Sequence, residues 1–476
     1  MDTSEFRAVG HRVVDLLADY LERIEQRPVF PKVEPAILNR LFDEPLPETG
    51  MSSNLVLDEL ERKLLPYCTH VGHPGYFGLI TPSPNLMGIL GDFICSALNQ
   101  NIGAYSIGPS AVAMERRTVR WLTSLVGYGE QAGGNLTSGC TMANFIGLKL
   151  ARDWASGDRA QHEGVREHWA VYASEERHVS VDKAVDAIGV GRAGLRTLPT
   201  DDVFQVRIDA LEAAIAEDRR KGIRPMCLVG IFGSTNTGAM DSLPDLRRIA
   251  DRESMWLHAD AAYGGGMLLS RERPMRDRGL ELADSITLDP HKWFFAPLDA
   301  GALLVKDESC LTRSFGMKPS YLTDGFDRSS ERYLYITHMC FEQSRRFRSL
   351  KVWMSLKRYG SAEIGRWIDA NVRQAERMHA LVEKHPDFEA ASDPPMSAIC
   401  IRYKGGEPAE AARLHSSVAR RIEQGGRFWI STTELKGRTW FRINPVNFST
   451  RPEQMDELLA LLERECAQAV VAAKKA

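Results

Sequence analysis

The sequence predicts an α/β fold built on a mainly parallel sheet with helices on both faces. Between residues 86 and 345, apolar runs of strand length alternate with helical stretches, as they do where helices join parallel strands. A long amphipathic helix precedes this region, and a helix-rich stretch with short strand-like runs follows it. These observations predict an N-terminal helical segment (1–85), a large domain (86–345) and a small C-terminal α+β domain (346–476).

The first predicted element is a helix with one apolar stripe. The stripe residues recur at helical spacing and are Phe6, Val9, Val13, Leu17, Tyr20 and Ile24. A stripe of this length ahead of the main domain needs a partner surface to cover it. The Pro-containing stretch from residue 28 to residue 47 is then predicted to be an extended connector.

The predicted strands of the large domain are five apolar runs. They begin at Val171, Met226, Met255, Ser285 and Ala302. Beyond them, residues 346–383 have a helical pattern, residues 398–401 and 440–443 predict short strands, and residues 453–469 predict a closing helix. We find no internal repeat and no low-complexity segment.

Two residues with cofactor chemistry, Asp260 and Lys292, each end an apolar segment. Asp260 follows the run that starts at Met255 and precedes a Gly-rich turn at 264–266. Ligands of open α/β sheets collect at such strand ends. Pyridoxal phosphate needs a lysine that forms a Schiff base and a carboxylate that keeps its pyridine nitrogen protonated. Either residue alone fits a helix cap or a solvated surface lysine equally well, but the pair predicts this cofactor.

The segment Asn135–Asn144 has the composition of a phosphate-binding turn, because small and hydroxyl residues precede a predicted helix. Backbone amides at a helix N-terminus bind a phosphate dianion. The candidates are Ser138, Gly139, Cys140 and Thr141, although the same pattern also makes an ordinary helix cap. His178 lies between a strand-like run and a predicted helix, where its ring could stack on the cofactor or serve as a capping or core residue.

Five motifs occur in a fixed order: Thr137-Ser-Gly-Cys-Thr141, His178-Val-Ser-Val-Asp-Lys183, Ser234-Thr-Asn-Thr-Gly238, His258-Ala-Asp-Ala-Ala-Tyr263 and Asp289-Pro-His-Lys-Trp293. With them, the chain resembles the group II pyridoxal-phosphate-dependent amino acid decarboxylases nearly from end to end. Phe6–Pro31 and Arg345–Lys351 resemble aromatic-L-amino-acid decarboxylase, whereas Gly72–Phe77, Asn99–Asn101 and Tyr263–Gly266 resemble the glutamate decarboxylase branch. The resemblance implies fold type I, with a seven-stranded type of sheet, and a homodimer whose active site lies at the subunit interface.

The resemblance also implies a role for each matching residue around the cofactor ring. Lys292 is the expected Schiff-base lysine, and Asp260 is the expected partner of the pyridine nitrogen. Ala262 and His178 are expected on opposite faces of the ring. Thr235 is expected near the ring oxygen or the substrate carboxylate.

Around the phosphate, the resemblance implies a set formed by Gly139, Cys140, Thr141 and His291. Two residues depart from the aromatic decarboxylase pattern. Asp289 replaces an asparagine, and an extra anion near a phosphate is unfavourable unless it turns away or is hydrogen-bonded. Cys140 replaces a smaller residue, so the local packing of the turn is expected to differ.

The family also uses a tyrosine on a mobile loop, which matches the segment Tyr321–Cys340. That tyrosine returns a proton to carbon after carbon dioxide leaves, and its replacement by phenylalanine is linked to aldehyde-forming chemistry. Tyr335 is the expected proton donor in preference to Tyr333. Both tyrosines could instead be packing aromatics.

The substrate pocket is predicted at Leu79, Ile80, Thr81 and, from the other subunit, Ala104. The resemblance implies that aliphatic or small residues at Leu79, Ile80 and Ala104 replace aromatic residues of the aromatic enzyme. An apolar pocket favours an aromatic amino acid such as tryptophan, tyrosine or dopa, because a substrate carboxylate beside Leu79 would lose its hydration. An acidic amino acid (glutamate, aspartate or cysteine sulfinate) and decarboxylation coupled to oxidative deamination stay as alternatives. Arg442 is either structural or reaches an acidic substrate. The motif order disfavours an aminotransferase, and the intact Lys292 and Asp260 disfavour a non-catalytic scaffold.

Composition limits the possible partners and compartments. The 476 residues carry a net charge of −3 with interspersed signs, which argues against nucleic acid as a partner. The eight cysteines have no C-x-x-C spacing, as expected in a reducing cytoplasm. No segment is apolar enough to predict a membrane span. His70 and His73 lack further clustered ligands, so no metal site is predicted.

Overall fold

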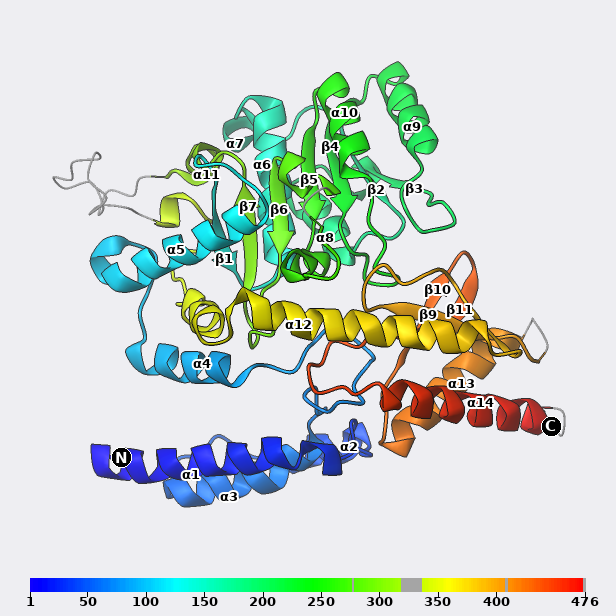
Figure 1. The fold of residues 1–476 in the computed structure, drawn as a ribbon. Coiled ribbons are helices and arrows are strands. Elements are labelled where there is room, and N and C mark those ends of the chain that lie inside the picture. The colour runs from blue at the N-terminus through cyan, green and yellow to red at the C-terminus, as the bar shows by residue number, and fades with distance from the viewer. Residues whose placement is uncertain (276–277, 318–335, 407–409, 474–476) are drawn as a thin grey trace. The chain divides into compact units, whose positions relative to one another are not determined.

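The computed structural model describes residues 1–275, 278–317, 336–406 and 410–473. The chain forms two compact units (Figure 1). Unit 1 comprises residues 1–79, 374–391 and 399–476, and unit 2 comprises residues 80–373 and 392–398. The division into three parts at residues 85 and 345 stays a prediction.

Unit 2 is built on a seven-stranded sheet with the strand order β1-β7-β6-β5-β4-β2-β3 (Figure 1). Its strands are β1 (Gly133–Thr137), β2 (Trp169–Ser174), β3 (Leu195–Leu198), β4 (Arg224–Ile231), β5 (Trp256–Asp260), β6 (Ser285–Leu288) and β7 (Gly301–Val305). Strands β2 to β6 pair in parallel, whereas β7 runs antiparallel to both of its neighbours, β1 and β6. The predicted mainly parallel sheet is confirmed, with β7 as the reversed strand.

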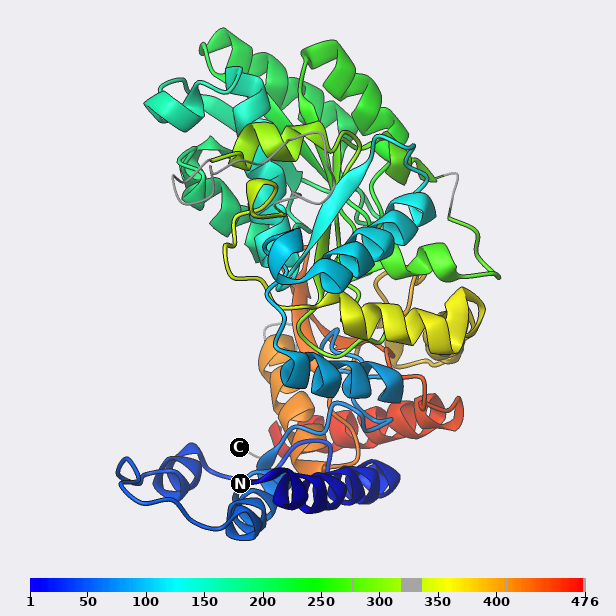
Figure 2. The same ribbon diagram turned by 90° about the vertical axis from the view of Figure 1, so that its left-hand side faces the viewer.

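Helices cover both faces of this sheet because successive strand residues point to opposite sides. Val171, Val229 and Leu303 share a core with α6 (Cys140–Ser156), α8 (Val179–Ala187) and α11 (Ser309–Phe315). Gly230 faces the other way, where a Cβ atom would lie 2.6 Å from Leu243 of α10 (Leu243–Glu253). Figure 2 shows helices on both sides of the sheet. The prediction of helices on both faces of the sheet is therefore confirmed.

The remaining helices of unit 2 are α4 (Leu86–Leu98), α5 (Pro109–Leu125), α7 (Ala160–Glu163) and α9 (Ile208–Arg220). The long helix α12 (Ser349–Glu383) bends at Gly360, whose φ of 69° is left-handed, and its residues from 374 onward belong to unit 1. Among the described residues, no helix is both long and apolar enough to cross a membrane.

Unit 1 joins the two ends of the chain. It contains α1 (Thr3–Glu22), α2 (Pro35–Leu41), α3 (Ser53–Lys63), α13 (Ala411–Gly425), α14 (Glu453–Ala473) and an antiparallel sheet of β8 (Phe388–Ala390), β9 (Ile399–Tyr403), β10 (Ser431–Leu435) and β11 (Arg438–Ile443). The Phe77 N–H donates to the Trp429 carbonyl at 2.8 Å. The Glu25 carboxylate accepts two hydrogen bonds of 2.8 Å from Arg451. The N-terminal segment thus packs with the C-terminal strands and helices.

Two local predictions were wrong. The stretch 28–47 is not fully extended, because it contains α2, whose first residue Pro35 has the fixed φ that starts a helix. The Gly-rich segment 264–266 is the start of a 3-10 helix, Gly264–Leu269, and not a simple turn. Its glycines permit close packing, since a Cβ atom on Gly264 would lie 2.0 Å from the Phe232 carbonyl oxygen.

Candidate active site

The predicted site residues of unit 2 follow strands that end at one edge of the sheet. His178 follows β2, Thr235 follows β4, Asp260 ends β5 and Lys292 follows β6. Gly139 follows β1, which runs in the same direction as β6 because both are antiparallel to β7. The carboxyl ends of such strands form the usual ligand site of an open α/β sheet. The fold therefore gathers these residues at one edge.

Lys292 lies beside the carboxylate of Asp289. The Lys292 Nζ atom is 3.3 Å from Asp289 Oδ2, and the Lys292 side chain is 14% exposed. Burial alone would lower the pKa of Lys292, but the carboxylates of Asp289 and Asp260 and the nearby Cys140 raise it further, so it ends above its usual value. Asp289 thus turns toward the lysine, and its contact keeps the amine charged in the free protein.

Asp260 is held at both carboxylate oxygens. Oδ2 accepts a hydrogen bond of 2.9 Å from Asn144 Nδ2, and Oδ1 accepts one of 3.2 Å from the Ala262 backbone N–H. The residue is 6% exposed at the end of β5. A buried carboxylate in a fixed orientation is suited to pair with a protonated ring nitrogen.

His178 caps the N-terminus of α8 and lies next to Cys140. Its Nδ1 atom accepts a hydrogen bond from the Ser180 backbone N–H at 3.3 Å and lies 2.7 Å from Ser180 Oγ. Cys140 Sγ is 4.0 Å from the same nitrogen. Burial lowers the pKa of His178 and raises the pKa of Cys140 to about 12. At neutral pH, the site thus presents an uncharged imidazole and an uncharged thiol.

The turn between β1 and α6 has the geometry of an anion cradle. Gly139 has a φ of 148°, and a Cβ atom there would lie 3.2 Å from His291 Cε1. A Cβ atom on Gly301 of β7 would lie 2.4 Å from Gly139 Cα. The Met142 and Ala143 N–H groups donate to the Gly139 carbonyl, which leaves the N–H groups of Cys140 and Thr141 for an anion, with the exposed side chains of Ser138 and Thr141 beside them.

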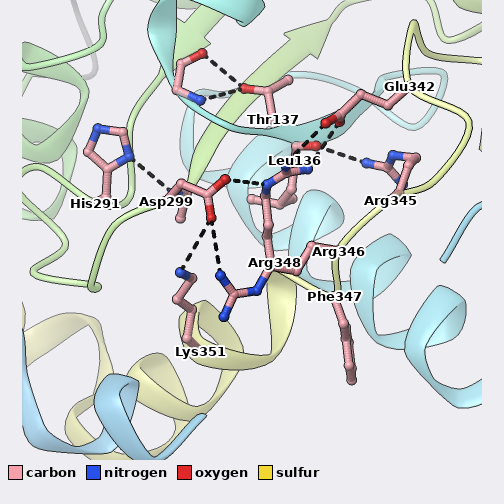
Figure 3. Close-up of polar contacts among 12 residues, drawn as sticks. Leu136, Thr137, His291, Asp299, Glu342, Arg345, Arg346, Phe347, Arg348 and Lys351 are labelled. Carbon is pink, nitrogen blue, oxygen red and sulfur yellow. Dashed lines mark hydrogen bonds and ion pairs between the residues drawn. The ribbon is translucent and has the colours of Figure 1, made fainter. Parts of the chain in front are cut away.

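A network of ion pairs anchors the segment that carries His291 (Figure 3). His291 Nδ1 accepts a hydrogen bond of 3.1 Å from the Ala300 N–H. The preceding residue, Asp299, accepts a hydrogen bond of 2.9 Å from Arg348 Nε and lies 3.9 Å from the Lys351 ammonium. Arg348 also binds both carboxylate oxygens of Glu342. Arg348 and Lys351 therefore hold in place the loop that contains Asp299 and Ala300.

The neighbouring Arg345 anchors β1 (Figure 3). Its NH2 group donates to Glu115 of α5 at 2.6 Å and to the Leu136 carbonyl of β1 at 2.8 Å. Arg345 and Glu115 are both buried. Removing one partner of a buried ion pair leaves an uncompensated charge. Arg345 thus stabilises the strand that leads into the phosphate turn.

Comparison with known proteins decides the family. The model of the pyridoxal-dependent decarboxylase conserved domain matches residues 35–404. The chain belongs to the pyridoxal-dependent decarboxylase family. Aromatic-L-amino-acid decarboxylase of Bacillus atrophaeus is 33% identical over 96% of this chain and 95% of that protein. Phenylacetaldehyde synthase of Arabidopsis thaliana is 28% identical over 98% of this chain and 97% of that protein.

Among solved structures, Oryza sativa TDC with PLP and tryptamine superimposes with a TM-score of 0.92. It is 26% identical, and the match covers 99% of both chains. The predicted fold type, the predicted cofactor and the predicted class of enzyme are confirmed. The protein is a pyridoxal-phosphate-dependent amino acid decarboxylase.

The residues of this decarboxylase fit the cofactor. Gly139 leaves the space that a side chain would fill, next to the open N-terminus of α6, which would hold the phosphate. The Lys292 amine and the Asp260 carboxylate supply the two groups that the aldehyde and the pyridine nitrogen need. Bound there, pyridoxal phosphate supplies a sink for the electron pair of a broken bond at the substrate carbon.

The remaining predicted residues of the decarboxylase are placed as follows. Ile80 and Ala104 are buried in unit 2, whereas Leu79, in unit 1, is 50% exposed and Thr81 is partly exposed. Their place beside the substrate stays a prediction. Tyr333 and Tyr335 lie outside the described residues.

Arg442 and the two histidines of unit 1 have structural partners. Arg442 is buried and its NH1 group donates to the Gly78 carbonyl at 2.9 Å. His70 Nδ1 lies 2.8 Å from the Tyr20 hydroxyl, and His73 Nδ1 accepts from the Gly75 N–H at 2.9 Å. Arg442, His70 and His73 thus each have a partner within unit 1.

Sequence reasoning missed Asn144 and Ser180, which contact Asp260 and His178. A signal was present, because Asn144 lies four residues after Cys140 and therefore on the same face of the helix. Ser180 lies two residues after His178, where short polar side chains often bond to a helix cap.

Proposed function

We propose that the protein decarboxylates an aromatic L-amino acid to the corresponding amine and carbon dioxide. The observation that carries this proposal is the buried Asp260 together with the partly buried Lys292 beside an open helix N-terminus, in a chain related over its length to aromatic-L-amino-acid decarboxylase. The solved relative with PLP and tryptamine supports an aromatic substrate. The buried apolar Ile80 and Ala104 support it further, because they suit an apolar side chain.

Each residue of the site then has a specific task. Asp260 holds a proton at the pyridine nitrogen, and Lys292 anchors the cofactor's carbonyl carbon. His178, uncharged, packs on the ring. The bond between the substrate's α-carbon and its carboxylate breaks, carbon dioxide leaves, and a proton is delivered to that carbon. Tyr335 is our proposed donor of this proton.

The experiment is a product analysis of the cofactor-loaded protein. Tryptophan, tyrosine, dopa, phenylalanine, histidine, glutamate, aspartate and cysteine sulfinate are each supplied, and carbon dioxide, amine and peroxide are measured together. Aromatic amine without peroxide supports the proposal. Carbon dioxide from glutamate, aspartate or cysteine sulfinate alone contradicts it and supports the acidic alternative, which the bond of Arg442 to Gly78 disfavours.

An aldehyde-forming reaction is the second candidate function, and the relative named phenylacetaldehyde synthase favours it. This reaction consumes oxygen and water and releases carbon dioxide, ammonia and peroxide with the aldehyde. With aldehyde measured as a fourth product of the same reactions, peroxide and aldehyde in equal amounts would support it. The presence of tyrosines at 333 and 335 favours the amine product.

We also propose that the protein acts as a homodimer in the cytoplasm. Helix α4 exposes a large apolar face formed by Leu86, Leu90, Phe93, Ile94 and Leu98. Apolar faces of this size usually mark an interface. The eight cysteines are all unpaired, which supports a reducing compartment. Sedimentation of Phe93→Glu tests the dimer: it should be monomeric, whereas Val203→Glu, at another exposed apolar residue, should sediment like the wild type.

A further inference from the structure

Asn144 makes every hydrogen bond that its side chain can make. Its Nδ2 group donates to Asp260 Oδ2 at 2.9 Å and to Ser180 Oγ at 2.8 Å. Its Oδ1 atom accepts from Thr287 Oγ1 at 2.6 Å and from His258 Nε2 at 2.9 Å. All five residues are buried. An amide has two donor hydrogens and two acceptor lone pairs, so none is left over.

The protons of this network can point in only one direction. The Trp256 indole, which can only donate, bonds to Ser285 Oγ at 2.8 Å. Asn144 Oδ1 can only accept, so the ring hydrogen of His258 lies on Nε2 and points at it; Nδ1 of the neutral ring then accepts from the Ser285 hydroxyl at 2.7 Å. Burial lowers the pKa of His258 to about 4, in agreement with a single ring proton. The amide of Asn144 cannot flip, because its oxygen would then face the Asp260 carboxylate.

The hydrogen bonds of Ser180 also determine which ring nitrogen of His178 carries the hydrogen. Because Ser180 Oγ accepts from Asn144, its hydroxyl hydrogen is free to donate to His178 Nδ1 at 2.7 Å. The Ser180 backbone N–H donates to the same nitrogen, which confirms Nδ1 as an acceptor. The ring hydrogen of a neutral His178 therefore lies on Nε2.

We propose that Asn144 is a positioning residue for the decarboxylation, which fixes the carboxylate of Asp260 and, through Ser180, the ring tautomer of His178. The inference rests on the proposed roles of Asp260 and His178. The side chain of Asn144 is fully buried, and all four of its hydrogen bonds are to other residues of the protein. It acts through Asp260, to which it donates directly, and through His178, which it reaches by way of Ser180.

The test substitutes Asn144→Asp and measures the affinity of the apoprotein for pyridoxal phosphate by fluorescence quenching, together with kcat and KM. The new carboxylate faces Asp260, and two adjacent carboxylates share a proton. The charge available to the pyridine nitrogen falls, so we expect the Kd to rise and kcat to fall roughly tenfold each, as for other supporting residues of a site. KM should change less than kcat.

The matched control is Asn447→Asp in unit 1. Asn447 is also buried, and its Nδ2 group donates to the Gly72 carbonyl at 2.8 Å. Both variants should lower the Tm of the apoprotein, because each places an acceptor against an acceptor. Only Asn144→Asp should change the Kd. Equal losses of Tm with an unchanged Kd and kcat at position 144 would make Asn144 merely structural and overturn the proposal.

Ser180→Ala tests the link from Asn144 to His178 separately from the link to Asp260. It removes the hydroxyl's contact with His178, keeps the weaker bond from the backbone N–H of residue 180, and leaves the bond from Asn144 to Asp260. We expect kcat to fall several-fold with an unchanged Kd. An unchanged kcat would refute the claim that Asn144 acts on His178 through Ser180. If Asn144→Asp does not fold, Asn144→Ser removes the amide and is judged by the same criteria. If the wild type binds cofactor but decarboxylates no amino acid, the proposed function fails, whereas the Kd comparison still tests Asn144.

Discussion

The ammonium of Lys292 lies 3.3 Å from the carboxylate of Asp289, three residues earlier in the chain. This contact has a kinetic consequence, because only the uncharged amine attacks an aldehyde. Burial lowers the pKa of Lys292, but Asp289 and the other nearby groups raise it above its usual value. The free protein therefore holds most of its lysine in the unreactive form.

We predict that Asp289→Asn speeds capture of pyridoxal phosphate at pH 7. Each unit by which the pKa of Lys292 falls increases the uncharged fraction about tenfold, so a roughly tenfold gain is expected. Stopped-flow absorbance of the apoprotein measures it. Pyridoxal without its phosphate is the control: an equal gain assigns the effect to Lys292, and a gain seen only with the phosphate assigns it to charge repulsion.

Lys292→Ala should abolish covalent capture of the cofactor and reduce decarboxylation to background. The physical reason is that the variant lacks the partly buried amine in the loop that follows β6. Borohydride reduction followed by peptide mass spectrometry locates the modified residue. Lys306→Ala, at an exposed lysine, should retain the mass increase on the peptide with Lys292. A labelled peptide elsewhere in Lys292→Ala would refute the assignment.

Tyr335→Phe should shift the product from amine toward aldehyde. Without the phenol, the substrate carbon lacks its proposed proton donor and is left open to oxygen. Amine, aldehyde and peroxide are measured in one reaction, and Tyr333→Phe is the matched control. If Tyr333→Phe gives the shift and Tyr335→Phe does not, the role belongs to Tyr333.

Stability should fall as the pH drops from about 6.5 to about 4. Burial lowers the pKa of His70, His258 and His415 to about 4, from 6.5. In this window the unfolded chain binds protons that the folded chain does not, so the free energy of unfolding decreases, by on the order of 1 to 3 kcal/mol for each histidine. Urea midpoints at pH 7.5 and 5 measure the loss.

His415→Gln isolates one of these contributions. The buried His415 accepts a hydrogen bond from the Tyr403 N–H at 3.2 Å, and glutamine can also accept it. The variant should lose less stability on acidification than the wild type. His11→Gln, at an exposed histidine, should behave as the wild type does. An identical acid response of His415→Gln and the wild type would contradict this prediction.

The fold was largely predictable because its central strands contain apolar runs, such as residues 226–231 of β4 and residues 255–257 at the start of β5. The reversal of β7 was not predicted, since its buried residues alone carry no information on direction. The signal lay in the link from Leu288 to Gly301, which contains no helix, whereas the crossover to a parallel neighbour is usually an α-helix. The packing of residues 1–79 with the C-terminal strands depends on contacts that no local pattern encodes.

The candidate site was predictable where a residue type stands at the end of a strand, as do Asp260 and Lys292. Asn144 and His258 were not recognised as a pair, because each alone is an ordinary buried polar residue. Their relationship requires α6 to pack across β5 and β6. Chemistry carried by single residues is thus visible in a sequence, whereas a network between elements depends on the fold.

The close approach of Gly301 to Gly139 has an evolutionary consequence. A single methyl group on Gly301 would collide with Gly139 Cα at 2.4 Å. Strand β7 and the turn before α6 therefore pack backbone against backbone, with no room for a side chain between them. Neither segment can be remodelled without moving the other. Substrate preference can therefore evolve through the surrounding loops, whereas the turn at Gly139 and the strand at Gly301 can change only together.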